Sequence, residues 1–186
     1  DHGCFVVMET KTGQIKAISN LGRDTDGSYY ETTNYAYTES HEPGSTFKLV
    51  DMMILLEDKK IDTSAVFNTY AGVVKYSGKS VRDSHTGGYG KISLARGFEV
   101  SSNTVLVQAV YNNYKNNPSQ FVNHINAIGL NKKLGLEFKG EGTPYIPQPS
   151  DKNWSNLSLP WMAFGYGVSV TPLQTLTFYN AVANNG

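Results

Sequence analysis

Cysteine is almost absent from this sequence, since Cys4 is the only one among 186 residues. A single cysteine excludes an internal disulfide framework and a metal site built from cysteine pairs. Cys4 opens the apolar run Cys4-Phe5-Val6-Val7-Met8, which is typical of a buried strand. We therefore expect a thiol in the core rather than a nucleophile.

An excess of charge of either sign is also missing, because 16 basic residues balance 16 acidic ones and the formal net charge is zero. Binding to nucleic acid or to an anionic membrane surface usually needs a basic surface, so neither partner is predicted. No apolar run is long enough to span a bilayer, and no signal peptide opens the sequence. We expect the chain to begin within a domain, with any export signal or membrane anchor upstream of Asp1.

The sequence does contain enough apolar residues, 39%, for one domain with a proper core. Two β-prone runs, residues 4–9 and 14–19, flank Lys11-Thr12-Gly13, which predicts a hairpin with glycine at the tight position. Residues 20–42 show little periodicity and are interpreted as a long surface loop. Short β-prone pieces recur at residues 72–74 and 80–82.

Helical patterns dominate the rest of the chain. Glu42-Pro43-Gly44-Ser45 is typical of a helix start, and this helix should end near Asp58. Ser101-Ser102-Asn103 can cap a second helix. Other helical stretches are predicted from Ser93, from Pro118 to Gly129 and from Pro172 to about Asn184, whereas residues 135–160 should be mostly irregular.

Two β-prone runs followed mainly by helices predict an α/β fold of the α+β type, in which a helical layer lies against an antiparallel sheet. A two-stranded sheet is marginal by itself, so we expect the sheet to have further strands that this sequence does not contain.

Ser45 and Lys48 carry the main chemical hypothesis. Residues i and i+3 share one face of a helix, so the Lys48 amine can lie beside the Ser45 hydroxyl. A serine nucleophile needs a base within reach, and burial lowers the pKa of a lysine enough to make it one. A helix start at Ser45 would add a backbone N–H as half of an oxyanion hole. The alternative is a capping serine followed by a solvated lysine.

Ser101 and Asn103 form a second polar pair at a predicted helix start. A hydroxyl and an amide spaced i, i+2 can point into one cleft, where Ser101 would relay a proton and Asn103 would hold Lys48 and the substrate. The alternative is an ordinary N-cap. The predicted catalytic set is therefore Ser45, Lys48, Ser101 and Asn103.

The spacing Ser45-x-x-Lys48, followed by Ser101-x-Asn103, resembles that of the penicillin-recognising serine enzymes. Four segments, taken in order, carry a closer resemblance. They are residues 8–17, Glu42-Pro43-Gly44-Ser45-Thr46-Phe47-Lys48, Ser101-Ser102-Asn103, and residues 165–174. Together they are similar to the transpeptidase domain of class B penicillin-binding proteins of the division type, over Gly3 to Gly186. The resemblance implies a penicillin-binding/serine β-lactamase-like transpeptidase fold, with residues 1–186 as a single incomplete domain whose C-terminal strands are missing.

The same resemblance implies a function. Ser45 would attack the D-Ala-D-Ala bond of a peptidoglycan stem peptide, with Lys48 as base and with Ser101 and Asn103 moving the proton and orienting the groups. An amine of a neighbouring strand would resolve the acyl-enzyme, and β-lactam antibiotics would acylate Ser45. The resemblance implies no cofactor or metal, a periplasmic location, and a membrane glycosyltransferase and division proteins as partners of the parent protein.

The third motif of that family, Lys-Thr-Gly, is expected downstream of Thr171-Pro172-Leu173-Gln174, but the sequence stops at Gly186 before reaching it. Lys11-Thr12-Gly13 has the same letters but lies in the predicted hairpin turn upstream of Ser45, so it is not assigned this role. Loss of one oxyanion donor can cost about 10²–10³ in rate. We expect these 186 residues alone to be weakly active or inactive.

Two other functions stay open. A serine β-lactamase with the same first two motifs would need a carboxylate to activate the deacylating water, and the sequence identifies none. A β-lactam sensor, or a non-catalytic scaffold for division proteins, would keep the fold without turnover.

Histidines and acidic residues suggest little else. Asp83-Ser84-His85 holds the residue types of a hydrolase triad, but adjacent residues cannot converge on one another. The four histidines show no paired metal-ligand spacing, so no metal site is predicted: His2, His41, His85 and His124.

Overall fold

The computed structural model describes residues 1–186, and its contacts divide the chain into two compact units. The first unit consists of Asp1–His41, Leu130–Tyr145 and Ser169–Gly186, and the second of Glu42–Gly129 and Ile146–Val168. The expectation of one domain over residues 1–186 stays a prediction. None of the helices combines the length and the apolar character needed to cross a membrane.

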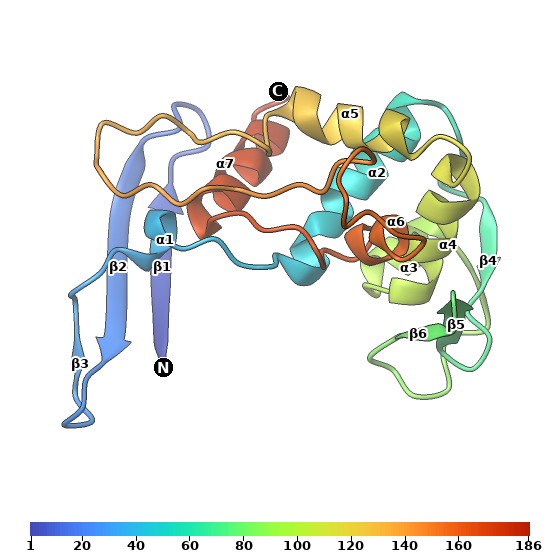
Figure 1. Ribbon diagram of the computed structural model, residues 1–186, viewed down its shortest axis with the longest axis horizontal. Helices are drawn as coiled ribbons and strands as arrows, with labels where there is room; N and C mark the ends of the chain where they lie inside the picture. Colours follow the sequence, from blue (N-terminus) through green and yellow to red (C-terminus); the bar gives the residue numbers. More distant parts are fainter. The chain divides into compact units, whose positions relative to one another are not determined.

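The first unit contains an antiparallel sheet with the order β1-β2-β3 (Figure 1). Its strands are β1 (His2–Met8), β2 (Ile15–Arg23) and β3 (Tyr29–Tyr30). The predicted hairpin between β1 and β2 is confirmed, because Gly13 N–H donates to the Glu9 carbonyl at 2.8 Å. Gly13 has a φ of 71°, a left-handed conformation that glycine adopts without a steric cost.

Residues 20–42 are not the surface loop that was expected. β2 continues to Arg23, and β3 and the short helix α1 (Tyr35–Thr38) follow. The buried Asn20 holds this region together: its N–H donates to Glu31 at 2.7 Å, and its side chain accepts from Ala36 N–H at 3.1 Å. β3 is held by two pairs with β2, and the start of α1 by the Asn20 side chain, so neither element has an apolar period that the sequence could show.

The expectation that Cys4 is a core thiol is also corrected, because Cys4 is only half-buried. The neighbouring Phe5, on the other face of β1, is 66% exposed. β1 is therefore covered on one face only.

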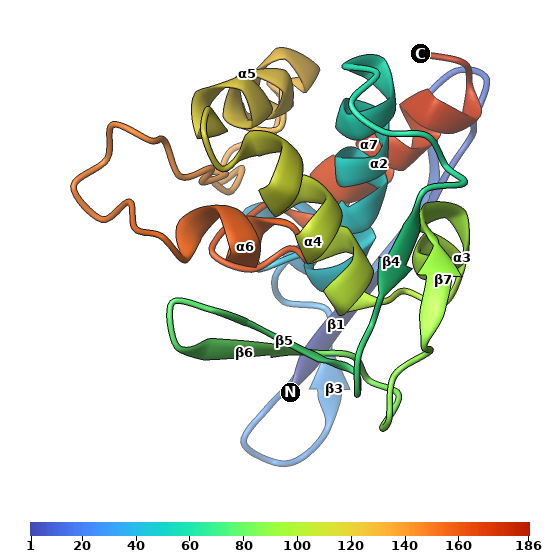
Figure 2. The ribbon, with the colours of Figure 1, turned by 90° about the vertical axis from the view of Figure 1, so that its right-hand side faces the viewer.

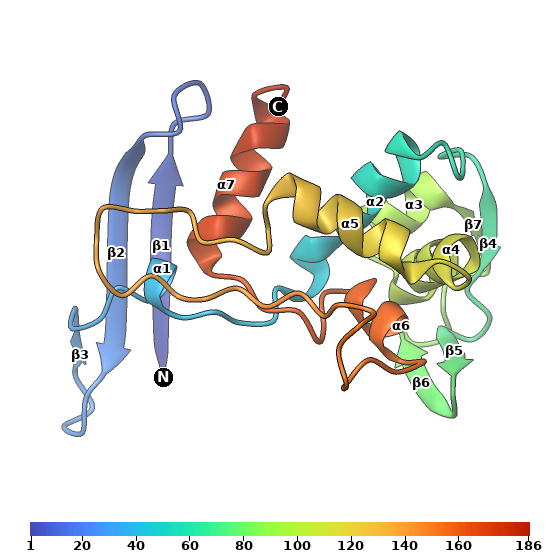
Figure 3. The ribbon, with the colours of Figure 1, turned by 45° about the horizontal axis from the view of Figure 1, so that its top comes forward.

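The helix α7 (Pro172–Ala183) lies beside β1 in the first unit (Figure 3). It begins with a reciprocal capping box, in which Thr171 Oγ1 accepts from Gln174 N–H and Gln174 Oε1 accepts from Thr171 N–H. The Gln174 amide also donates to the Lys132 carbonyl at 2.7 Å. The predicted helix after Thr171-Pro172 is confirmed, and its cap satisfies two otherwise unpaired N–H groups.

The second unit is built around the helix α4 (Asn103–Tyr114) (Figure 2). The inner residues of α4 are completely buried. α4 contacts most of the other helices of this unit. These are α2 (Lys48–Glu57), α3 (Leu94–Glu99), α5 (Pro118–Ile128) and α6 (Ser158–Met162). The sequence predicted α2, α3 and α5. For α5 the signals were Pro118 in the first turn and Gly129, which is a left-handed C-cap. The sequence did not predict α6, which lies at the end of the stretch expected to be irregular.

Two small antiparallel pairs complete the second unit. β5 (Val73–Tyr76) pairs with β6 (Lys79–Arg82), which confirms the β-prone pieces near residues 72–74 and 80–82. β4 (Val66–Asn68) pairs with β7 (Lys91–Ser93), and these strands are too short for alternation to show in the sequence. Helices together with antiparallel sheets match the predicted α+β type.

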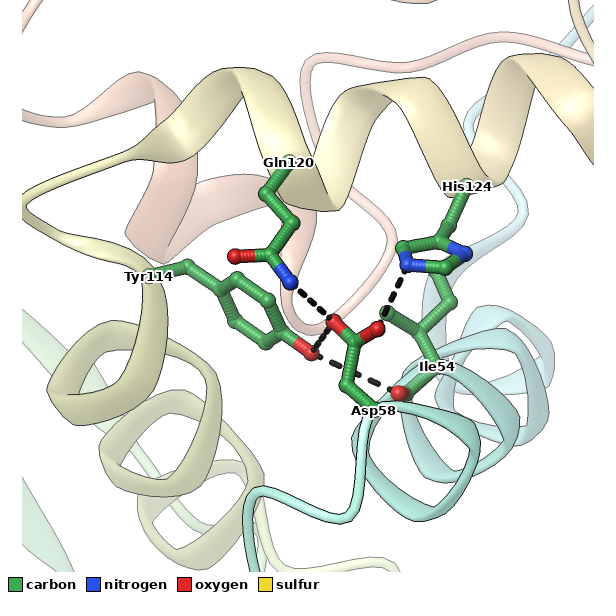
Figure 4. Close-up of polar contacts among 5 residues, drawn as sticks. All are labelled: Ile54, Asp58, Tyr114, Gln120 and His124. Carbon is green, nitrogen blue, oxygen red and sulfur yellow. Dashed lines mark hydrogen bonds and ion pairs between the residues drawn. The ribbon is translucent and has the colours of Figure 1, made fainter.

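A partly buried carboxylate joins three helices of the second unit (Figure 4). Asp58, the C-cap of α2, accepts hydrogen bonds from Tyr114 at 2.7 Å, Gln120 at 2.9 Å and His124 at 2.7 Å. Burial alone would raise the pKa of Asp58, but the hydrogen bonds from Tyr114 and His124 lower it below its ordinary value. The same contact and burial raise the pKa of Tyr114.

We predict that Asp58→Asn lowers the free energy of unfolding at neutral pH by about 2–3 kcal/mol, because charge-assisted hydrogen bonds are lost around a buried tyrosine hydroxyl. The folded-state pKa of Asp58 is depressed, so its contribution is present above the unfolded pKa of about 4 and is lost as the pH falls. Urea unfolding between pH 3 and 7 measures both effects. Glu57→Gln removes an exposed charge next to it and should change stability by less than about 0.5 kcal/mol. Equal losses in the two variants would contradict the prediction.

Candidate active site

Ser45 lies in a 3₁₀ turn, η1 (Gly44–Phe47), that continues into α2. The expected α-helical start at Ser45 is therefore corrected: the α-helix begins at Lys48, whose N–H donates to the Ser45 carbonyl. Side chains at i and i+3 of a 3₁₀ turn are nearly eclipsed, so Ser45 and Lys48 still share one side. Ser45 is exposed, whereas Lys48 is only 1% exposed.

The glycine-rich residues 165–167 contact the backbone that precedes Ser45. Gly44 N–H donates to the Gly165 carbonyl at 3.1 Å, and Gly167 N–H donates to the Glu42 carboxylate at 2.8 Å. A Cβ atom on Gly165 would lie 2.0 Å from the Gly44 carbonyl oxygen. Only glycine permits this approach, so residues 165–167 fix the backbone immediately before Ser45.

The Lys48 amine is held by three acceptors. Its Nζ donates to the Ser101 carbonyl at 2.6 Å, to Ser101 Oγ at 3.0 Å and to Asn103 Oδ1 at 2.6 Å. An ammonium group has three donors, so this arrangement saturates it. Burial lowers the pKa of Lys48 to about 8, although the charges of Asp51 and Asp83 raise it. The alternative of a solvated lysine is thus wrong.

Ser101 has a left-handed backbone, with a φ of 55°, which is uncommon for a residue with a side chain. Such conformations cost of order 1–3 kcal/mol and gather at functional sites. Here the conformation lets both the carbonyl and the hydroxyl of Ser101 meet the Lys48 amine. The capping residue of α4 is Ser102, which accepts from Val105 N–H, so capping does not account for Ser101.

Asp83 anchors the start of α4, a role that the sequence did not suggest. Its carboxylate accepts from Ser102 Oγ at 3.0 Å and from the Thr104 N–H and hydroxyl at 2.9 Å each. Nearby, the Asn103 amide donates to the Arg82 carbonyl at 2.7 Å, which orients its oxygen toward Lys48. Asp83 is thus engaged with α4, while His85 stacks on Tyr89. Setting aside Asp83-Ser84-His85 as a triad agrees with these contacts.

Asp51 is the other residue that sequence analysis missed. It lies one helical turn after Lys48, it is 0% exposed, and neither carboxylate oxygen has a hydrogen-bond partner. Burial raises the pKa of Asp51 well above its ordinary value, and the charge of Lys48 opposes this. An acidic residue at i+3 from Lys48 in an otherwise apolar helix was the available signal.

Asp51→Asn is expected to move the pH midpoint for reaction at Ser45 downward. The charge of Asp51 raises the pKa of Lys48, so its removal lets that pKa fall further below about 8 and gives neutral amine at lower pH. The folded-state pKa of Asp51 itself is raised, so its ionisation costs stability as the pH rises above about 4, and the variant removes this cost. The rate at which Ser45 reacts with an acylating reagent, followed across pH 5–10, measures the midpoint. An unchanged or higher midpoint, or an equal shift in Glu57→Gln, would count against the coupling.

The structure therefore places all four predicted residues in the second unit and joins three of them by hydrogen bonds. The arrangement offers an exposed hydroxyl, a buried amine one turn away, and a second hydroxyl that contacts this amine. Such a set can activate a serine for attack on a carbonyl and move its proton to a leaving group.

Comparisons with known sequences all indicate the same protein family. The family model described as "Penicillin binding protein transpeptidase domain" matches residues 3–186. The penicillin-binding protein PbpB of Mycolicibacterium smegmatis is 29% identical over 97% of this chain, which spans 28% of that protein. The peptidoglycan D,D-transpeptidase FtsI of Escherichia coli K12 is 27% identical over the whole chain, which spans 31% of that protein.

Solved structures agree on the fold. The TP domain of penicillin-binding protein 3 from Burkholderia pseudomallei superposes with a TM-score of 0.83 and 23% identity, over all of this chain and 50% of the other. The predicted fold class is thereby confirmed. The chain spans about a third or less of the length of the two curated relatives.

Proposed function

This chain belongs to the family of penicillin-binding protein transpeptidase domains, and on that premise we propose that it is the acyl-transfer part of a serine-type peptidoglycan D,D-transpeptidase. The observation that carries the proposal is the Lys48 amine, which is buried one turn from Ser45 and is bonded to both Ser101 and Asn103. Ser101 and Asn103 of the predicted catalytic set thus both contact the Lys48 amine.

In the proposed reaction, Ser45 Oγ attacks the carbonyl of the penultimate D-Ala of a stem peptide. Lys48, as the neutral amine, takes the hydroxyl proton while the O–C bond forms. Ser101 passes a proton to the leaving nitrogen and receives one in turn from the protonated Lys48, the C–N bond breaks, and D-Ala departs. An amine of a second stem peptide then attacks the ester, a new C–N bond forms as the ester C–O bond breaks, and the proton lost by the amine returns to Ser45.

β-Lactams react with Ser45 through the same acylation step. Ser45 opens the ring amide, but the leaving nitrogen stays tethered to the acyl group, so the ester persists. The parent protein is proposed to act on the periplasmic side, held by a membrane segment upstream of this chain, with a glycosyltransferase and division proteins as partners.

A β-lactamase is the nearest alternative. It needs a carboxylate that activates water beside the ester, but the acid close to Lys48, Asp51, is fully buried. This favours a long-lived ester over rapid hydrolysis.

A chromogenic β-lactam tests the choice. We expect slow ring opening that stops after one equivalent per protein, and no reaction in Ser45→Ala. Continuous turnover would make the protein a β-lactamase. Release of D-Ala from a peptide ending in D-Ala-D-Ala, dependent on Ser45, separates a transpeptidase from a β-lactam sensor, which would react with the antibiotic only.

A further inference from the structure

Three potential metal ligands converge in the first unit, apart from the residues described above. His2 Nε2 lies 3.0 Å and His41 Nε2 lies 3.2 Å from the same oxygen, Glu39 Oε2. One ligand atom from each residue lies within 4.8 Å of the other two. His2 begins β1, whereas Glu39 and His41 follow α1, so residues distant in the sequence meet here.

Backbone pairing holds the two histidines in place. His2 pairs with Gly22 in the β1–β2 ladder, and His41 forms a two-bond bridge with Val170 at 3.0 Å in each direction. Glu39 is the extended residue that ends α1, two positions before His41. Ligands on paired strands keep their geometry better than ligands on loops.

Tyr35 fixes the orientation of one imidazole. The His2 ring stacks on the Tyr35 ring with centroids 4.1 Å apart and an interplanar angle of 21°. The Tyr35 hydroxyl in turn occupies the space where a Cβ of Gly22 would lie, so the tyrosine is itself packed on β2. His2 is thus aimed at Glu39 by its packing.

We propose that His2, Glu39 and His41 form a binding site for a single Zn²⁺ ion. Two imidazole nitrogens and one carboxylate oxygen are a ligand set that zinc takes in proteins, with a fourth position left for water. With zinc–ligand bonds of 2.0–2.2 Å, neighbouring ligands of a tetrahedron lie about 3.3–3.6 Å apart. The two nitrogen–oxygen distances, 3.0 and 3.2 Å, need only a small expansion to accept the ion.

The chemistry of the donors also selects among cations. Mg²⁺ and Ca²⁺ prefer sets made only of oxygen, whereas imidazole nitrogens favour first-row transition metals such as zinc. The three side chains are 40%, 38% and 52% exposed, which leaves access for the ion and for its water ligand. Bound zinc would fasten the start of β1 to the segment after α1.

Titration calorimetry with ZnCl₂ on the whole chain tests the site. We expect one equivalent of Zn²⁺ to bind and the melting temperature to rise, with no effect of Mg²⁺. His41→Ala and Glu39→Gln should each weaken zinc binding more than the roughly 10–100-fold that loss of an outer partner costs. Co²⁺ bound in place of zinc should show the visible absorption of a tetrahedral site, and this band should vanish in both variants.

Two variants serve as matched controls. His85→Ala removes another exposed histidine that stacks on a tyrosine, and it should bind zinc as the wild type does. Cys4→Ser removes the single thiol of the chain, which lies two residues after His2 on β1, and it should also leave zinc binding intact. Failure of the wild type to bind one equivalent, or equal affinity in His41→Ala and wild type, would overturn the proposal.

Discussion

Replacing Lys48 by methionine is expected to slow the acylation of Ser45 by a β-lactam by about 10²–10⁴-fold, the range that a general base contributes. Methionine keeps the length and apolar character of the buried stem but cannot accept a proton. The amine that contacts Ser101 and Asn103 would be lost with it. Time-resolved labelling with a fluorescent penicillin measures the rate.

Two companion variants separate the role as a base from the role as a buried charge. Lys48→Arg keeps a positive charge near Asp51 but does not deprotonate, so it should be as slow as Lys48→Met. The double variant Lys48→Met/Asp51→Asn removes both members of the buried pair and should melt at a higher temperature than Lys48→Met, because no unpaired buried carboxylate remains. A rate near that of wild type in Lys48→Arg would contradict the assignment of Lys48 as the base.

Gly165→Ala is expected to reduce acylation by about 10²-fold or more, since misplacing a reacting group by 1 Å can cost that much. The new methyl group would lie 2.0 Å from the Gly44 carbonyl oxygen, and that contact is with backbone rather than with a flexible side chain. The Gly44-Ser45 turn must therefore move. Labelling rates report the displacement of Ser45, and thermal melting reports the accompanying loss of stability.

Gly167→Ala is the matched control for this prediction. Gly167 also has a positive φ, 72° against 80° for Gly165, but a Cβ there meets no atom within 4 Å. It should show the cost of the backbone conformation without the clash. If both variants lost acylation equally, the contact between Gly165 and Gly44 would not be what positions Ser45.

The parts of the fold that the sequence predicted are those with local signals. The hairpin at Gly13, the C-cap at Gly129 and the capped start of α7 each follow from residues within one turn of the boundary. The region of β3 and α1 was missed because its order depends on Asn20, whose partners, Glu31 and Ala36, lie far along the chain. Such long-range hydrogen bonds leave no periodic pattern.

The candidate site also combines features that the sequence predicted with features that it did not. The spacing of Ser45 and Lys48 on one helical face was visible, and so was the likeness of Ser101 and Asn103 to a known motif. The buried Asp51 was present as an anomaly in an apolar helix, but its burial depends on packing that only the fold reveals. The cluster of His2, Glu39 and His41 could not be found from spacing, because tertiary contacts bring it together.

Mass spectrometry of the penicillin-treated chain tests the central claim, that Ser45 is the acylated nucleophile. The account predicts one added antibiotic per molecule in the intact mass, located by peptide mapping on Ser45. The adduct should be absent in Ser45→Ala and present in Thr46→Ala, which removes the neighbouring exposed hydroxyl. An adduct that persists in Ser45→Ala, one that maps to Ser101, or no adduct on the wild type of the full-length parent protein would contradict the account.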